Sequence, residues 1–101
     1  MVSKFNLPGI AAGLPAAWRS GGVGRVGPLQ IKVLRMDEQA YAAEAHTFDE
    51  ALLVLDGVLN LDVGGTVTAV RAGDVVIVPA GHPHAVAPGS QGTLVILDLA
   101  A

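Results

Sequence analysis

The sequence predicts an all-β fold, a barrel or jelly roll built from about eight short strands. Three observations predict it. The chain is 51% hydrophobic but only 4% aromatic, so its core has to come from Val, Leu, Ile and Ala, and β-branched residues favour strands. From residue 29 onward, short apolar or alternating segments follow one another with turn residues between them. No long helical pattern interrupts these segments, so a sheet that curls on itself is expected.

The 101 residues are enough for one domain. We expect residues 1–28 to form an N-terminal arm that packs on the barrel or on a partner, and residues 29–101 to form the barrel. In the arm, apolar side chains recur at four-residue steps, which predicts a short helix with one apolar stripe. A packing role for this stripe and a lid over a ligand are both open. The stripe consists of Ile10, Leu14 and Trp18.

Glycine marks the turns between the expected elements. Gly21, Gly22, Gly24 and Gly27 precede Pro28 and predict a loop. Gly64-Gly65 lies between two alternating segments and predicts a two-residue hairpin turn, because such turns require positive φ angles. The expected strands are Gln30 to Met36, Ala40 to His46, Ala51 to Leu55, Val58 to Val63, Thr66 to Arg71, Val75 to Val78, Pro83 to Ala87 and Thr93 to Leu99.

Two of these strands, Ala51 to Leu55 and Val75 to Val78, are apolar at every position. Such runs are typical of strands that are covered on both faces. A chain of this size has no helices to cover the outside of a barrel. We therefore expect a homodimer, in which a partner barrel or the arm covers the outer face.

Composition excludes several classes of protein. Without cysteine there are no disulfides, thiolate ligands or cysteine nucleophiles, and a cytoplasmic location is the default. Six scattered basic residues and a net charge of −3 leave no basic patch for nucleic acid. No apolar run reaches the roughly 20 residues of a membrane-spanning helix. The expected partner is a small-molecule ligand or substrate.

The segment from Glu44 to Gly57 has the residue types of a metal site. Glu44 and His46 are two residues apart, so on a strand they project from one face. Glu50 follows after a short turn. If the turn returns Glu50 to that face, carboxylate oxygens and an imidazole converge in a mixture that suits Mn, Fe, Zn or Ni. Asp49 is interpreted as solvated surface.

A second segment carries a more specific pattern. Gly73, Pro79, Gly81 and His84 match the spacing G-x5-P-x-G-x2-H, so the segment resembles the second cupin motif, with Pro88 in the place of the usual Asn. The first cupin motif, G-x5-H-x-H-x3-4-E-x6-G, is matched by His46, Glu50 and Gly57. Glu38 stands in the place of its leading glycine and Glu44 in the place of its first histidine.

The resemblance implies a cupin-type double-stranded β-helix, the jelly-roll barrel. It also implies that Glu44, His46, Glu50 and His84 hold a divalent metal ion, Fe, Mn or Zn, with Ni possible. The alternative for the two histidines is a neutral, hydrogen-bonded core residue. His82 is expected at the rim of the site rather than as a ligand.

Cupins carry many activities, so function has to be argued from the site. One hypothesis is a metal-dependent oxygenase or isomerase acting on a small polar molecule, with Glu44 as a ligand or as a base. Arg35 and Gln30 are then the polar candidates for orienting the substrate. The second is a small-ligand binding or sensor barrel without catalysis or metal. The third is a purely structural barrel.

Overall fold

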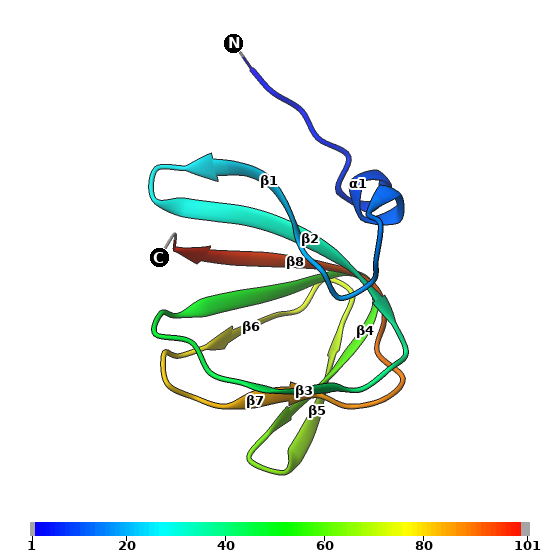
Figure 1. Cartoon of the computed structure of the whole chain (residues 1–101), viewed down its shortest axis with the longest axis vertical. Coiled ribbons are helices and arrows are strands. Elements are labelled where there is room, and N and C mark those ends of the chain that lie inside the picture. Colours follow the sequence, from blue (N-terminus) through cyan, green and yellow to red (C-terminus); the bar gives the residue numbers. More distant parts are fainter. Residues whose placement is uncertain (1, 100–101) are drawn as a thin grey trace.

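A computed structural model describes residues 2–99, apart from the side chain of Ala43. It contains one short helix and eight strands in one antiparallel sheet that curls on itself, which confirms the predicted fold class (Figure 1). The described residues contain no helix long and apolar enough to cross a membrane. The elements are α1 Leu7–Gly13, β1 Gly21–Val26, β2 Leu29–Asp37, β3 Tyr41–Glu44, β4 Glu50–Val63, β5 Thr66–Arg71, β6 Val75–Val78, β7 His84–Val86 and β8 Gln91–Leu99.

Strand β4 organises the sheet. It pairs with β5, β6, β7 and β8 and lies inside the sheet, whose path runs β1-β2-β8-β4-β7-β3. Two separate strands were expected here, with Gly57 between them, and this prediction was wrong. A bulge between Val54 and Asp56 keeps the strand continuous, and it shifts the inward-facing positions from Leu52 and Val54 to Leu59 and Leu61.

Gly57 lies inside β4, where the strand passes closest to β8. A Cβ on Gly57 would stand 1.9 Å from the carbonyl oxygen of Gln91, and one on Gly92 would stand 2.1 Å from that of Asp56. Both glycines also have positive φ angles. This crossing therefore needs glycine for close approach rather than for a turn.

The glycine-rich segment before Pro28 is a strand and not the predicted loop. It forms β1, an edge strand that pairs with β2 through a short hairpin at Gly27. A register shift between Gly22 and Gly24 interrupts the pairing. Glycine weakens a strand interior but is tolerated at an edge and at a bulge, which explains why the pattern misled.

The hairpin at Gly64-Gly65 is confirmed, because both glycines have positive φ and Val63 pairs with Thr66 across the turn. The strands Thr66–Arg71 and Val75–Val78 have the predicted bounds. His46 was expected inside a strand, but β3 ends at Glu44 and His46 lies in the loop that follows.

Helix α1 begins after Asn6, whose side chain accepts the N–H of Gly9 at 2.8 Å. It is shorter than the stripe predicts and ends at Gly13. Ala11 is its buried residue and packs towards β2 and β8. Trp18 lies outside the helix with a positive φ, and its ring packs against the barrel core.

The core fills the inside of the curled sheet with aliphatic side chains from β2, β4, β5, β6 and β8. The outer face is covered only in part. Val33 and Val95 are buried on that face, whereas Val75 and Ile77 of β6 are 55% and 66% exposed. Within one chain the outer face of β6 is therefore uncovered, and its expected cover by a partner barrel stays a prediction.

Candidate metal centre

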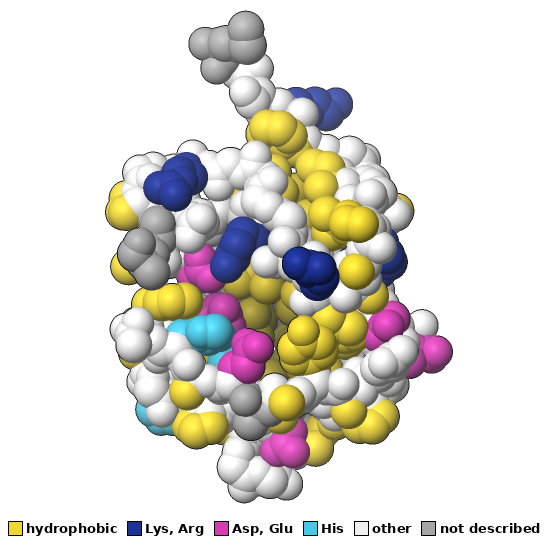
Figure 2. Space-filling model, viewed as in Figure 1, with side chains coloured by type: hydrophobic (Ala, Val, Ile, Leu, Met, Phe, Trp, Pro, Cys, Tyr) yellow, Lys and Arg dark blue, Asp and Glu magenta, His cyan; other side chains and the backbone are white. Residues whose placement is uncertain are grey.

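The barrel has a cavity of about 280 Å3 at its open end. Figure 2 shows this end of the molecule hollowed, with a hydrophobic floor, histidine and acidic side chains on the left of the hollow and basic side chains along its upper edge. Trp18 and Tyr41 stand in its wall with their ring centroids 5.5 Å apart. Leu34, Leu52, Leu59, Leu61, Leu94 and Ile96 contribute most of the apolar lining.

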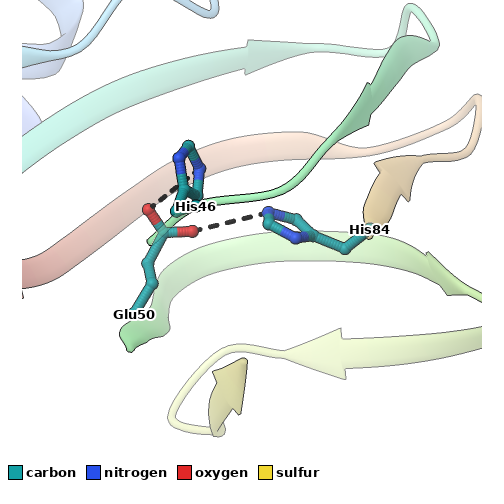
Figure 3. Close-up of side chains that lie close together, drawn as sticks. All are labelled: His46, Glu50 and His84. Atoms are coloured by element: carbon teal, nitrogen blue, oxygen red, sulfur yellow. Dashed lines mark ion pairs between the residues drawn. The ribbon is translucent and has the colours of Figure 1, made fainter. Parts of the chain in front are cut away.

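Three side chains from separate parts of the chain converge on this cavity (Figure 3). His46 comes from the loop before β4, Glu50 begins β4, and His84 begins β7. Glu50 Oε1 lies 3.5 Å from His84 Nε2, and Glu50 Oε2 lies 3.8 Å from His46 Nε2. One donor atom from each residue lies within 4.8 Å of the other two. The structure thus brings together three of the four predicted ligands.

The imidazole of His84 is held by the backbone next to it. Its Nδ1 lies 3.2 Å from the carbonyl oxygen of His82, and only a protonated Nδ1 forms a hydrogen bond with a carbonyl. This contact favours the tautomer that leaves Nε2 with a free lone pair towards Glu50. The side chain of His82 is exposed, at the rim where it was expected.

Two hydrogen bonds join the loop of His46 to the loop that precedes His84. The N–H of Gly81 donates to the carbonyl of His46 at 2.8 Å, and the N–H of Ala80 donates to Asp49 Oδ1 at 2.9 Å. Asp49 was interpreted as solvated surface, yet its exposed carboxylate fastens these loops. The signal for this role was its place one residue before Glu50, in the turn that must return the chain to the cavity.

Glu44 lies at the rim of the cluster. Its Oε2 is 3.6 Å from His46 Nε2, and its backbone pairs with that of His84 across β3 and β7. Its side chain is 54% exposed, and Glu44 is outside the group of three. A role as fourth ligand or as base stays a prediction.

The charge of Glu50 is the strongest sign of a cation. Its side chain is only 8% exposed, and among the described residues no hydrogen bond to its carboxylate is formed; the two imidazoles lie beside it, at 3.5 Å and 3.8 Å. A buried carboxylate without a compensating charge is costly. Two neutral imidazoles and one carboxylate, facing a cavity, are a donor set that fits Mn, Fe, Zn or Ni.

A buried ion pair that sequence reasoning missed lies beside the cluster. Lys32 Nζ on β2 is 2.7 Å from Asp98 Oδ2 on β8, and Lys32 lines the cavity. Asp98 is 1% exposed. One signal in the sequence could have indicated this pair. If Leu34 and Ile96 face inward, alternation places Lys32 and Asp98 at inward positions of two apolar strands.

Of the two polar candidates for orienting a substrate, whose facing the sequence left open, one lies outside the cavity. Arg35 points out of the barrel, where its guanidinium donates to the carbonyls of Ala11 and Leu14 at the end of α1. It cannot face the cavity because Leu34 beside it does. Gln30 shares the inward face, where its Nε2 donates to Asp98 Oδ1 at 3.4 Å.

Comparison with known structures gives the same architecture. A protein from Neisseria meningitidis is 21% identical with a TM-score of 0.83, covering 97% of this chain and all of its own. A cupin-2 domain containing protein from Shewanella frigidimarina is 18% identical with a TM-score of 0.85, covering 95% of this chain and 94% of its own. A cupin superfamily protein from Desulfitobacterium hafniense is 21% identical with a TM-score of 0.74, covering 100% and 95%. At these identities the likeness concerns the fold alone.

No curated protein matches the sequence. The family model described as a cupin domain matches residues 33–100, which include the whole His46, Glu50 and His84 cluster. The chain therefore belongs to the cupin family.

Proposed function

We propose that this barrel holds a divalent metal ion through His46 Nε2, His84 Nε2 and the carboxylate of Glu50. The buried charge of Glu50 is the observation that carries the proposal. Each imidazole presents a nitrogen to that carboxylate, and in the neutral His84 ring a hydrogen bond from Nδ1 to the His82 carbonyl leaves the lone pair on Nε2, the nitrogen that would ligate the ion.

A small molecule enters the cavity beside this centre, and the reaction class we propose is oxygenation or isomerisation. A bound divalent ion supplies Lewis acidity or an O2-binding position there. The chain supplies the rest. Aliphatic side chains exclude water from the floor, and Glu44, at 3.6 Å from His46 Nε2 and half exposed at the mouth, is placed to accept a proton from the ligand or to serve as a fourth ligand.

The exposed side chains of β6 support a second proposal, a homodimer. In the register of the sheet, Val75 lies next to Leu53, and Ile77 lies next to Ala51. Further rows of apolar residues on β8 and β2 continue this outer face. A second barrel of the same kind buries such a surface.

The metal proposal is tested by elemental analysis of the purified protein, before and after chelation and reloading with Fe(II), Mn(II), Zn(II) or Ni(II). We expect about one ion per chain at neutral pH and a loss of at least tenfold in affinity for Glu50→Gln. Glu38→Gln, which removes an exposed carboxylate elsewhere, is the control and should bind metal as the wild type does.

Oxygen uptake by the loaded protein with small diols, thiols and sugars tests for oxygenation, and NMR spectra of the same mixtures test for isomerisation, which consumes no O2; the two together separate turnover from binding. Wild-type protein that takes up no metal would remove the proposal in favour of a metal-free ligand-binding barrel. Loaded protein without turnover, but with saturable ligand binding, would assign a sensor role.

A further inference from the structure

The second charged feature of the cavity is Lys32 on β2, which is separated from the Glu50 strand β4 by β8. It lies on β2 with Leu34, and both side chains line the cavity that His46, Glu50 and His84 also line. Its side chain is 26% exposed, whereas Asp98, its partner at 2.7 Å, is 1% exposed. Lys32 thus has access to the cavity and Asp98 does not.

The ion pair with Asp98 fixes the position of the Lys32 ammonium group but does not engage all of its N–H donors. An ammonium group has three N–H donors. Among the described residues, Asp98 is the one acceptor within reach of Lys32, and even this contact lacks regular hydrogen-bond geometry, because Asp98 Oδ2 has no geometric hydrogen-bond partner. Donors on Lys32 therefore remain free towards the cavity.

The register of the sheet explains why a positive charge is needed here at all. Asp98 pairs with Glu50 across β8 and β4, so their side chains lie on the same face, about 5 Å apart at Cβ. Two carboxylates at that spacing repel each other. Lys32 neutralises the Asp98 side, and a divalent ion on the cluster would neutralise the Glu50 side.

The net charge of the cavity then determines the charge of the ligand that it attracts. Glu44, Glu50 and Asp98 against Lys32 leave a negative site that repels anions. A divalent ion brings this count to zero, and the free donors of Lys32 then attract a single negative charge. A single ammonium in a mainly aliphatic cavity suits a carboxylate better than a phosphate dianion, which needs more donors.

The rest of the wall determines the body of the ligand. Trp18 and Tyr41 offer aromatic surface at the mouth, and the floor is aliphatic. A volume of about 280 Å3 accepts a small molecule only. We infer that the ligand is a small monocarboxylate with an apolar body, whose carboxylate binds Lys32 while the body contacts the aliphatic floor near the metal. The inference rests on the proposed metal centre, which makes the cavity neutral.

Calorimetric titration of the zinc-loaded protein with hexanoate, hexanamide and hexylamine tests the inference, since the three share an apolar body and differ in the charge of the head. We expect hexanoate to bind at least about tenfold more tightly than hexanamide, and hexylamine to bind most weakly. Lys32→Met should remove the preference for hexanoate, and Lys32→Arg should retain most of it. Arg71→Met, which removes an exposed charge outside the cavity, is the matched control and should keep the preference.

Because Lys32→Met leaves Asp98 buried without its partner, the double variant Lys32→Met, Asp98→Asn is measured beside it, with circular dichroism to verify the fold. Two results would overturn the inference. One is hexanoate that binds no better than hexanamide. The other is a preference for hexanoate that survives in Lys32→Met and in the double variant, because the carboxylate then ligates the metal directly. Zinc content measured on the same samples separates the two proposals. The Lys32 variants should keep their zinc. A wild-type protein that takes up no zinc would overturn the metal proposal and the charge balance that depends on it, whereas zinc-loaded wild type without a preference for hexanoate would overturn the carboxylate inference alone.

Discussion

Asp49 Oδ1 accepts the backbone N–H of Ala80 at 2.9 Å, and this bond joins the turn that delivers Glu50 to the turn that delivers His84. The two turns are 31 residues apart in sequence. Beside it, the Gly81 N–H donates to the carbonyl of His46. Asp49 is therefore a positioning residue: it touches none of the donor atoms, yet their spacing depends on the loops that it fastens.

Asp49→Ala is expected to weaken metal binding by about tenfold, because groups that orient metal ligands contribute on that scale. Competition with a chromophoric chelator measures the affinity. Asp74→Ala is the matched control, since Asp74 Oδ2 accepts the Arg71 N–H at 3.0 Å in the turn between β5 and β6, and Asp74 does not line the cavity. Equal effects of the two substitutions on metal affinity would refute a positioning role for Asp49.

The two histidines around Pro83 are expected to differ sharply. His84→Ala removes a donor atom from the cluster and should abolish metal retention through desalting. His82→Ala should leave it nearly intact, because His82 contributes its backbone carbonyl to His84 and its imidazole is exposed. Metal-to-protein ratios from elemental analysis decide the matter. Unchanged retention in His84→Ala would exclude His84 as a ligand.

Glu38 has a φ of 74°, a left-handed conformation that glycine adopts without strain. Its backbone N–H donates to the carbonyl of Ser90, and its own carbonyl accepts the N–H of Gly89. These bonds fix the conformation, so Glu38→Gly is expected to raise the free energy of unfolding by roughly 0.5–1 kcal/mol. Urea denaturation of metal-free protein measures it.

Gln39→Gly on the neighbouring exposed residue is the control for the Glu38 substitution. Gln39 is not among the non-glycine residues with positive φ, so added glycine freedom should lower stability there. A decrease of the same size for both substitutions would mean that the conformation of Glu38 carries no strain.

Ile77 is 66% exposed at the centre of the outer apolar face of β6. Sedimentation velocity at micromolar concentration is expected to show a dimer of the wild type and a monomer of Ile77→Lys, with the same circular dichroism. Thr68→Lys, on β5 in the hairpin with β4, is the control and should remain dimeric. A wild-type protein of 10.2 kDa under these conditions would end the dimer proposal.

The sequence predicted the fold class and the convergence of His46, Glu50 and His84, because the two motifs fix the turns that orient these side chains. It did not predict Lys32 and Asp98 as a pair, since contacts between strands far apart in sequence depend on which strands become neighbours. The facing of Arg35 stayed open for a related reason: alternation gives two faces to a strand but does not say which one is inside. The bulge in β4 changes which alternate residues of that strand point inward, and the residues of the strand do not predict the bulge.

The pairing of β2 with β8 has a consequence for how fast the protein folds. Residues 29–37 pair with residues 91–99, and β8 lies between β2 and β4, so β2 and β4 both find their shared neighbour far along the sequence. A barrel closed by such distant strands folds in milliseconds to seconds, as sheets of high contact order do. The single tryptophan, Trp18, packs on the core and reports this step in stopped-flow fluorescence, where a submillisecond phase of full amplitude would contradict it.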